Sequence, residues 1–156
     1  MTRSPITLVP VEVEPDAVDE LRLHGDEFFG IDLARHNSGV LVTKLADLGV
    51  RLLVAEWDGV ASGFAGYAHN PANLRQAAVS VSARDRERTT ELLAELVRLL
   101  RTTARTRSFV SVLRENTSAL GAHLAAGFTE AGRLRARRFH DFRYHDEIVL
   151  YQEDDS

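Results

Sequence analysis

The sequence predicts an α/β (α+β) fold in which helices flank a mixed, mostly antiparallel central sheet. A two-residue Asp58-Gly59 turn joins two apolar runs, which is a strong signal for a β-hairpin. A helical pattern over 86–103 then lies between two β-branched runs and predicts a right-handed β-α-β unit. The element order is β-α-α-β-β-β-α-β-α-β-β.

The N-terminal half is predicted from alternation, from helical spacing and from glycine or proline signals at the element ends. Its elements are a strand over 6–12, a helix from Pro15 to about residue 23, a break over 24–37, and a second helix through Leu41 and Leu45 that ends near Gly49. A Gly-Asp pair and a Phe-Phe-Gly run mark the break between the two short helices.

The C-terminal half carries the stronger patterns. Its predicted elements are strands over 51–57 and 60–68, a turn over 70–73, a strand over 76–82, a helix over 86–103, a strand over 108–113, a short helix capped by Asn116 or Thr117 and ending before Gly127, and strands over 130–138 and 144–152. Leucine and valine residues form a broad apolar stripe on the long helix, which predicts that it packs against the sheet.

Length and composition limit the function. A chain of 156 residues fits a single domain over 1–156, and the formal net charge of -4 does not favour a nucleic-acid partner. The absence of cysteine excludes disulfides, thiolate metal sites and a cysteine nucleophile. Residues 1–10 lack the apolar core of a signal peptide, and no apolar run has membrane-spanning length. We therefore expect a cytoplasmic protein with no membrane partner.

The segment 114–128 contains three landmarks at a defined spacing. Asn116 is followed seven positions later by His123, and Gly127-Phe128 begins four positions after that. This pattern resembles the second motif of the GNAT superfamily (general-control-related N-acetyltransferases). The preceding hairpin and the closing Tyr144-His145-Asp146 are also similar, so the resemblance covers residues from about 51 to the C-terminus. Histidine in place of the family's tyrosine, with Tyr144 and Asp146 downstream, resembles the phosphinothricin-type acetyltransferase branch.

The resemblance implies an N-acetyltransferase that moves an acetyl group from acetyl-CoA to a small-molecule primary amine. It places His123 at the position of the family's general acid, which protonates the departing thiolate. We expect no metal, and the sequence allows a homodimer. The residues expected to bind acetyl-CoA are Val79, Val81, Arg84, Arg86, Arg88, Thr89, Thr90 and Asn116.

The expected pyrophosphate loop departs from the family pattern. The family uses a Gln/Arg-x-x-Gly-x-Gly/Ala loop, whose glycines let backbone N–H groups approach the phosphates. Here Glu87 and Thr89 occupy both glycine positions. Either the arginines over 84–88 replace the backbone donors with charge-assisted contacts, or the cofactor site is lost. The alternatives are therefore a non-catalytic ligand- or partner-binding module and an acyltransferase that uses a different donor.

Two chemical roles remain open in the sequence. His123 shares a helical face with Leu120, Leu124 and Gly127, so a buried structural histidine competes with a catalytic one. The strand over 76–82 carries no acid that could serve as a general base. The acidic candidates elsewhere are Asp26, Glu27, Glu56, Asp141 and Asp146. The His-Asp pairs over 140–146 lack a recognised metal-ligand spacing and predict a surface turn between the last two strands. The resemblance implies that this turn flanks the acceptor pocket.

Overall fold

A computed structural model describes residues 6–153 of the chain. The elements in chain order are β1 (Ile6–Val11), α1 (Pro15–Arg22), β2 (Glu27–Phe28), β3 (Ile31–Asp32), the 3-10 helix η1 (Leu33–Arg35), α2 (Ser38–Asp47), β4 (Arg51–Trp57), β5 (Val60–Asn70), β6 (Asn73–Ala83), α3 (Arg86–Thr103), β7 (Ser108–Arg114), α4 (Ser118–Ala125), β8 (Thr129–His140) and β9 (Arg143–Glu153). Among the described residues, no helix has the length and apolar character needed to span a bilayer.

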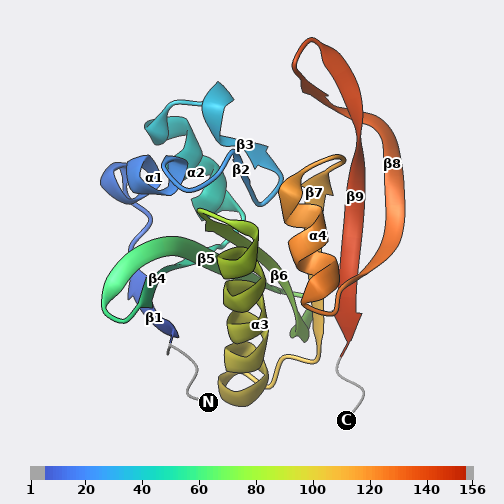
Figure 1. Cartoon of the computed structure of the whole chain (residues 1–156). Helices are drawn as coiled ribbons and strands as arrows, with labels where there is room; N and C mark the ends of the chain where they lie inside the picture. The colour runs from blue at the N-terminus through green and yellow to red at the C-terminus, as the bar shows by residue number, and fades with distance from the viewer. Residues whose placement is uncertain (1–5, 154–156) are drawn as a thin grey trace.

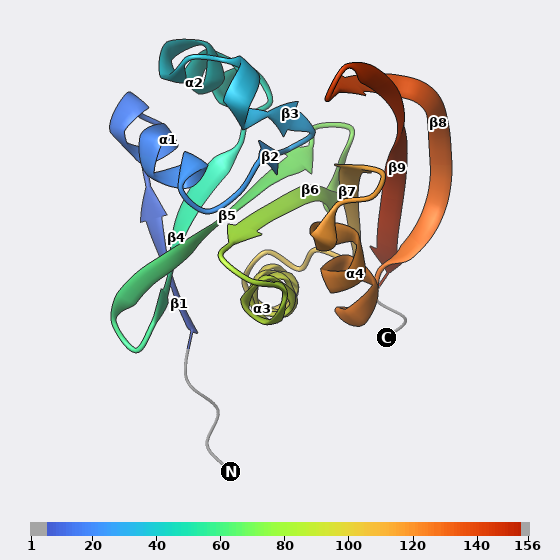
Figure 2. The ribbon, with the colours of Figure 1, turned by 45° about the horizontal axis from the view of Figure 1, so that its top comes forward.

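The central sheet confirms the predicted fold class. Within residues 6–153 it contains seven strands in the order β1-β4-β5-β6-β7-β9-β8, and a separate β2-β3 hairpin forms a small second sheet. Every neighbouring pair of the large sheet is antiparallel except β6 and β7. Helices α1 and α2 lie with the β2-β3 hairpin on one side of the sheet, and α3 and α4 lie on the other (Figures 1 and 2).

The parallel strands β6 and β7 pair over a short distance only. Their register runs from Gln76 opposite Ser108 to Ala78 opposite Val110, and the described residues show no further pairing between these strands. The long helix α3 makes the connection from β6 to β7, as the β-α-β pattern predicts. Because the strands separate after Ala78, the sheet opens into a gap at the end where β6 leads into α3.

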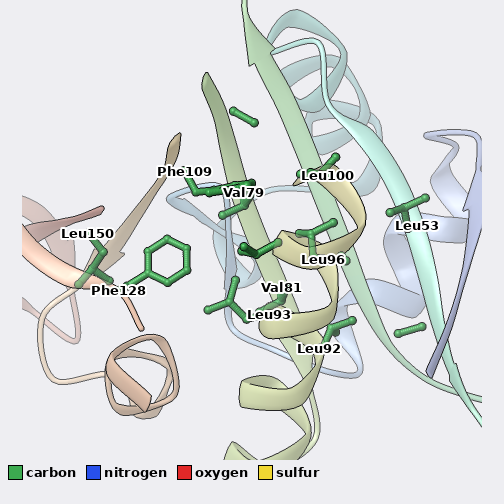
Figure 3. Packing of buried hydrophobic residues seen from close by; sticks show 14 of the residues in the cluster. Leu53, Val79, Val81, Leu92, Leu93, Leu96, Leu100, Phe109, Phe128 and Leu150 are labelled. Atoms are coloured by element: carbon green, nitrogen blue, oxygen red, sulfur yellow. The ribbon is translucent and has the colours of Figure 1, made fainter. Parts of the chain in front are cut away.

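The main core lies between the sheet and α3. Leu92, Leu93, Leu96 and Leu100 project from one face of α3 toward the sheet, and all four are buried (Figure 3). Full burial of one such side chain contributes about 1.5–3 kcal/mol. The apolar stripe predicted from the sequence is therefore the face of α3 that packs against β6. This packing fixes the position of the start of α3, which lines the cleft described below. A second cluster, on the other side of the sheet, includes Val18, Leu21, Phe28, Leu41 and Phe64.

The segment between the first two helices differs from the sequence-based expectation. Residues 24–37 were predicted to be a simple break, but they contain the β2-β3 hairpin and η1. Strands of two residues are too short to show a period of two, which explains why the pattern does not reveal them. At α4 the N-cap is Thr117, and Asn116 lies outside the helix with a φ of 63°. Asn116 is therefore not the cap.

Gly66 on β5 lies where the β2-β3 hairpin packs against the sheet. A Cβ at this position would lie 2.8 Å from a ring carbon of Phe29 and 2.9 Å from one of Phe28. We expect Gly66→Ala to lower the free energy of unfolding by about 1–3 kcal/mol, because two packed rings must move. Gly132→Ala is the matched control, since a Cβ there meets nothing within 4 Å. Urea unfolding measures both, and equal stability of the two variants would contradict the packing of the hairpin.

Candidate active site

A cleft of about 260 Å³ occupies the gap between the separating strands. It extends from the end of β6 and the start of α3 to the end of β7 and the start of α4. Its lining residues are His24, Gly25, Asp26, Glu27, Ser80, Val81, Ser82, Ala83, Arg84, Arg86, Thr89, Leu113, Ser118 and Ala119. The cleft thus combines the sequence-predicted loop after β6 with a segment between α1 and α2 for which the sequence predicts no element.

The two sides of β6 have different chemistry at the cleft. Val79 and Val81 belong to the core under α3. Successive side chains of a strand point to opposite faces, so Ser80 and Ser82 face the side of α1 and α2. The Ser80 hydroxyl accepts a hydrogen bond from the Phe29 N–H at 3.0 Å. The Ser82 Oγ is buried and, among residues 6–153, has no hydrogen-bond partner.

Residues 24–29, here called the bridging segment, connect the two separating strands. Phe29 binds β6 through Ser80, and at the other end the Glu27 carboxylate accepts the Arg114 N–H of β7 at 3.1 Å. The neighbouring Asp26 carboxylate accepts the Arg114 guanidinium at 3.1 Å. Gly25 lies directly on Ser82, since a Cβ at this position would be 2.2 Å from the Ser82 Oγ. The bridging segment therefore covers the gap on the side opposite α3.

Glu27 is a buried carboxylate at the wall of the cleft. Burial raises its pKa, while the Arg138 guanidinium and the Arg114 N–H act in the opposite direction. The Arg138 guanidinium donates to Glu27 at 2.5 Å and to Glu147 of β9 at 3.3 Å. This network joins the bridging segment to both strands of the β8-β9 hairpin. Its outer member, Asp26, keeps 61% of its side chain exposed.

The end of the cleft near α3 carries the predicted phosphate-binding residues. Arg84, Arg86 and Thr89 line it, as does Val81. Asp85 caps α3, because its carboxylate accepts the Arg88 N–H at 2.8 Å. The Thr89 hydroxyl donates to the Asp85 carbonyl at 2.7 Å. A carboxylate of the protein thus takes one of the N–H donors that a pyrophosphate would need at this helix end.

Arg86 offers a different contact for an anion. Its guanidinium lies over Gly121 of α4, where an added Cβ would be 2.9 Å from the guanidinium carbon. The absence of a side chain at Gly121 therefore leaves room for the Arg86 guanidinium, a cation, between the start of α3 and the first half of α4. Acetyl-CoA fits this cleft if Arg84 and Arg86 supply the phosphate contacts that the capped helix end does not.

Four other predicted cofactor-binding residues do not line the cleft in the described part of the chain. Val79 packs in the core, and the Arg88 guanidinium lies over the Trp57 ring at 5.8 Å from its centroid. The Thr90 hydroxyl donates to the Arg86 carbonyl at 2.9 Å. Asn116 precedes the cap of α4. Contacts from these four to a ligand stay predictions.

His123 lies between α4 and β7, and its side chain is 1% exposed. One ring nitrogen, Nδ1, donates to the Ala119 carbonyl at 2.8 Å, and the Ser111 hydroxyl donates to Nε2 at 2.9 Å. Burial lowers the pKa of His123, so the ring is neutral at neutral pH. Both nitrogens thus have protein partners, and His123 is not among the residues that line the cleft.

The structure separates the acidic candidates. Asp26 and Glu27 line the cleft, whereas Glu56, Asp141 and Asp146 are not among its lining residues. His140 and His145 contact acidic side chains near the end of the β8-β9 hairpin, but no group of three or more metal-ligand side chains within residues 6–153 is placed to hold a metal ion.

Sequence reasoning did not find His24, Ser82 and Arg138. The polar run 24–27 between two helices is the signal that marks the first of these.

Comparison with known proteins identifies the fold. No family model matches the chain, and no curated protein matches it in sequence. Solved structures match closely in shape. A spermidine N-acetyltransferase chimera, SpeG from Vibrio cholerae with hSSAT, has a TM-score of 0.73 at 18% identity and covers 95% of each chain. A proposed phosphinothricin N-acetyltransferase has a TM-score of 0.73 at 18% identity, covering 97% of this chain and 100% of its own.

A third similar structure was determined with a bound ligand. The proposed acetyltransferase yncA from Salmonella typhimurium, solved with its cofactor acetyl-CoA, has a TM-score of 0.69 at 17% identity and covers 97% of this chain and 95% of its own. The split parallel strands, the crossover helix and these matches define a mixed α/β fold. The chain has the GNAT acetyltransferase fold.

Proposed function

We propose that the protein is an N-acetyltransferase that moves an acetyl group from acetyl-CoA to a small-molecule primary amine. The observation that carries this proposal is the cleft where β6 and β7 separate, with arginines at one end and carboxylates along the bridging segment. Solved structures with the same fold include proteins described as N-acetyltransferases and one described with acetyl-CoA. A fold alone does not define an activity, so the proposal depends on how the two ends of the cleft suit the two substrates.

The donor end suits a long anionic thioester. Beyond Ala78, β6 has no strand partner on the side of β7 in the described chain, which leaves backbone groups near Val81 available for the pantetheine arm. Arg84 and Arg86 line the same cleft after the end of β6, and we expect the pyrophosphate to bind beside them. Guanidinium groups form bidentate, charge-assisted hydrogen bonds with phosphate oxygens.

The acceptor end suits a cationic amine. Asp26 and Glu27 line the cleft, and the exposed Asp26 carboxylate attracts an ammonium group from solvent. In the reaction the ammonium loses a proton, and its nitrogen attacks the thioester carbonyl carbon. The C–S bond then breaks, the thiolate leaves with the electron pair, and a proton from the new amide nitrogen neutralises it.

Two measurements test the proposed function. Acetyl-CoA is expected to raise the melting temperature, because a ligand that binds only the folded state stabilises it. Thiol release with a panel of primary amines is then expected above the rate of hydrolysis. Stabilisation without thiol release for any amine would indicate a non-catalytic binding module. Release only with a thioester donor that carries no pyrophosphate would indicate a different donor, a second candidate that the Asp85 cap favours.

The charges at the start of α3 give a matched set of variants. We expect Arg86→Gln to weaken acetyl-CoA binding by roughly tenfold to a hundredfold, the scale of a charge-assisted hydrogen bond. Glu87→Gln is expected to strengthen binding about two- to fivefold, since it removes a repelling charge from the helix end. Arg98→Gln is the control, because Arg98 pairs with Glu95 farther along α3. Calorimetry measures all three, and equal affinities would contradict phosphate binding at this end.

A further inference from the structure

The charged side chains at the wall of the cleft differ in how many of their atoms already have protein partners. Among residues 6–153, the acidic and basic side chains that line the cleft, histidine aside, are Asp26, Glu27, Arg84 and Arg86. Both carboxylate oxygens of Glu27 have donors, because Oε1 accepts the Arg114 N–H and Oε2 accepts the Arg138 guanidinium. Glu27 is also buried. It therefore holds the wall of the cleft together and has little capacity to bind a ligand.

Asp26 is the carboxylate that a ligand can reach. Its side chain is 61% exposed, whereas the side chain of its partner Arg114 is 9% exposed. The Arg114 guanidinium donates to Oδ2 of Asp26 at 3.1 Å, and no residue in the described part of the chain donates to Oδ1. The buried guanidinium thus holds one oxygen of the carboxylate and leaves the other free for a ligand in the cleft.

The cations closest to Asp26 are already paired with carboxylates. Arg114 pairs with Asp26 itself. Arg138 pairs with Glu27 at 2.5 Å and with Glu147 at 3.3 Å. Three carboxylates thus share two guanidinium groups in this network, which leaves one negative charge in excess at the end of the cleft formed by the bridging segment.

His24 also lines the cleft, and it adds no positive charge there at neutral pH. Burial lowers its pKa, the Arg84 cation lowers it further, and Glu20 acts in the opposite direction. The effect of Arg84 on His24 shows that the charge of Arg84 extends to the bridging segment. In the proposed reaction, however, the phosphates of the donor occupy Arg84 and Arg86. A second anion would then find no free cation among the described residues that line the cleft.

We propose that Asp26 selects the acceptor by charge, so that the protein acetylates amines without a carboxylate in preference to amino acids. This inference rests on the proposed acyl transfer and specifies its substrate class. The ammonium group of the acceptor binds beside Oδ1 of Asp26 before it loses its proton. A carboxylate on the same molecule would be repelled by Asp26 and would have no cation to pair with, which is how a site rejects an unwanted ligand.

Two acceptors that differ in one charge test this selection. Propanolamine and β-alanine have carbon chains of the same length and amines of similar basicity, but only β-alanine carries a carboxylate. With acetyl-CoA as donor at neutral pH, we expect the parent's kcat/KM for propanolamine to be about ten- to a hundredfold higher than for β-alanine. The ratio is expected to decrease as the salt concentration rises, because salt screens the exposed charge of Asp26.

Variants of Asp26 separate its charge from its packing. Asp26→Asn keeps an oxygen for the Arg114 guanidinium and is expected to reduce the ratio to below about threefold, chiefly through a higher KM for propanolamine. Asp26→Glu keeps the charge and is expected to retain most of the parent's ratio. Asp47→Asn is the matched control, because Asp47 is exposed on α2 and is not among the residues that line the cleft. Thermal melts of each variant confirm that it is folded.

The contradicting outcomes distinguish the selection from the acyl transfer. Thiol release with equal kcat/KM for the two acceptors, or with the parent's ratio in Asp26→Asn, would overturn the selection and leave the acyl transfer standing. A preference for β-alanine that is lost in Arg84→Gln would also overturn the selection, and would assign Arg84 to the acceptor's carboxylate.

A binding measurement covers the case in which no amine gives thiol release and the acyl transfer therefore fails. Calorimetry then compares the binding of propanolamine and β-alanine with CoA present. Tighter binding of propanolamine that is lost in Asp26→Asn would support charge selection at Asp26 without the reaction. Equal binding of the two compounds to the parent would overturn the selection as well.

Discussion

Glu27→Ala is expected to lower the free energy of unfolding by about 3–5 kcal/mol, the usual effect of removing one partner from a buried ion pair. The side chains of Glu27 and Arg138 are 4% and 14% exposed, so the remaining guanidinium would keep little contact with water. The variant also leaves the Arg114 N–H without its carboxylate partner. Urea unfolding followed by circular dichroism measures the loss.

A set of related variants separates charge from packing. Glu130→Ala removes an exposed partner of Arg133 and is expected to cost less than about 1 kcal/mol. The double variant Glu27→Met with Arg138→Met is expected to recover part of the loss, because it removes the unpaired guanidinium and keeps apolar volume. Recovery is incomplete because Glu147 and the Arg114 N–H still lose their partners. Burial raises the pKa of Glu27, which agrees with a pair whose desolvation cost is large. A loss below 1 kcal/mol in Glu27→Ala would contradict the buried network.

The fold was predictable where the sequence pattern extends over several residues. The predicted helix 86–103 coincides with α3, and the Asp58-Gly59 turn lies between β4 and β5 as expected. Both features arise from local signals, namely an apolar stripe and a turn dipeptide. The β2-β3 hairpin was missed because its strands of two residues are too short to show an alternating pattern.

The candidate site was predictable only in part, because only some of its residues are neighbours in the sequence. Val81, Arg84, Arg86 and Thr89 follow one another along the chain, so one motif brings them to the cleft together. The contact between Glu27 and Arg138 joins positions 111 residues apart, and no local pattern in a single sequence reports such a pair. His24 reaches Ser82 in the same way, through the packing of the bridging segment.

The N-cap of α3 uses a backbone donor that an anion would also need. Asp85 is a favourable N-cap, and α3 begins at the next residue, Arg86. The same carboxylate uses a backbone donor that a pyrophosphate would otherwise bind. Helix stability and anion binding compete for the same N–H groups, which makes the arginines the main candidates for phosphate contact.

His123→Phe is expected to lower the free energy of unfolding by about 2–5 kcal/mol and to change turnover at pH 7 by less than about twofold. The stability loss follows because the Ser111 hydroxyl and the Ala119 carbonyl each lose a partner in a buried place, at about 1–3 kcal/mol per group. Turnover is expected to persist because His123 does not line the cleft in the described structure. Thermal melts and a thiol-release assay on the same samples measure both quantities.

The pH dependence of the unfolding free energy also tests whether His123 is a buried structural residue. Burial lowers the pKa of His123, so below about pH 6.5 the unfolded chain binds a proton that the folded chain does not. The unfolding free energy of the parent should therefore fall as the pH drops below 6.5, and the slope should be smaller in His123→Phe. Ser111→Ala should show a smaller loss than the phenylalanine variant, and the double variant should be non-additive, because the two side chains share one hydrogen bond. A phenylalanine variant with the parent's stability and a turnover lowered a hundredfold would instead assign His123 to proton transfer.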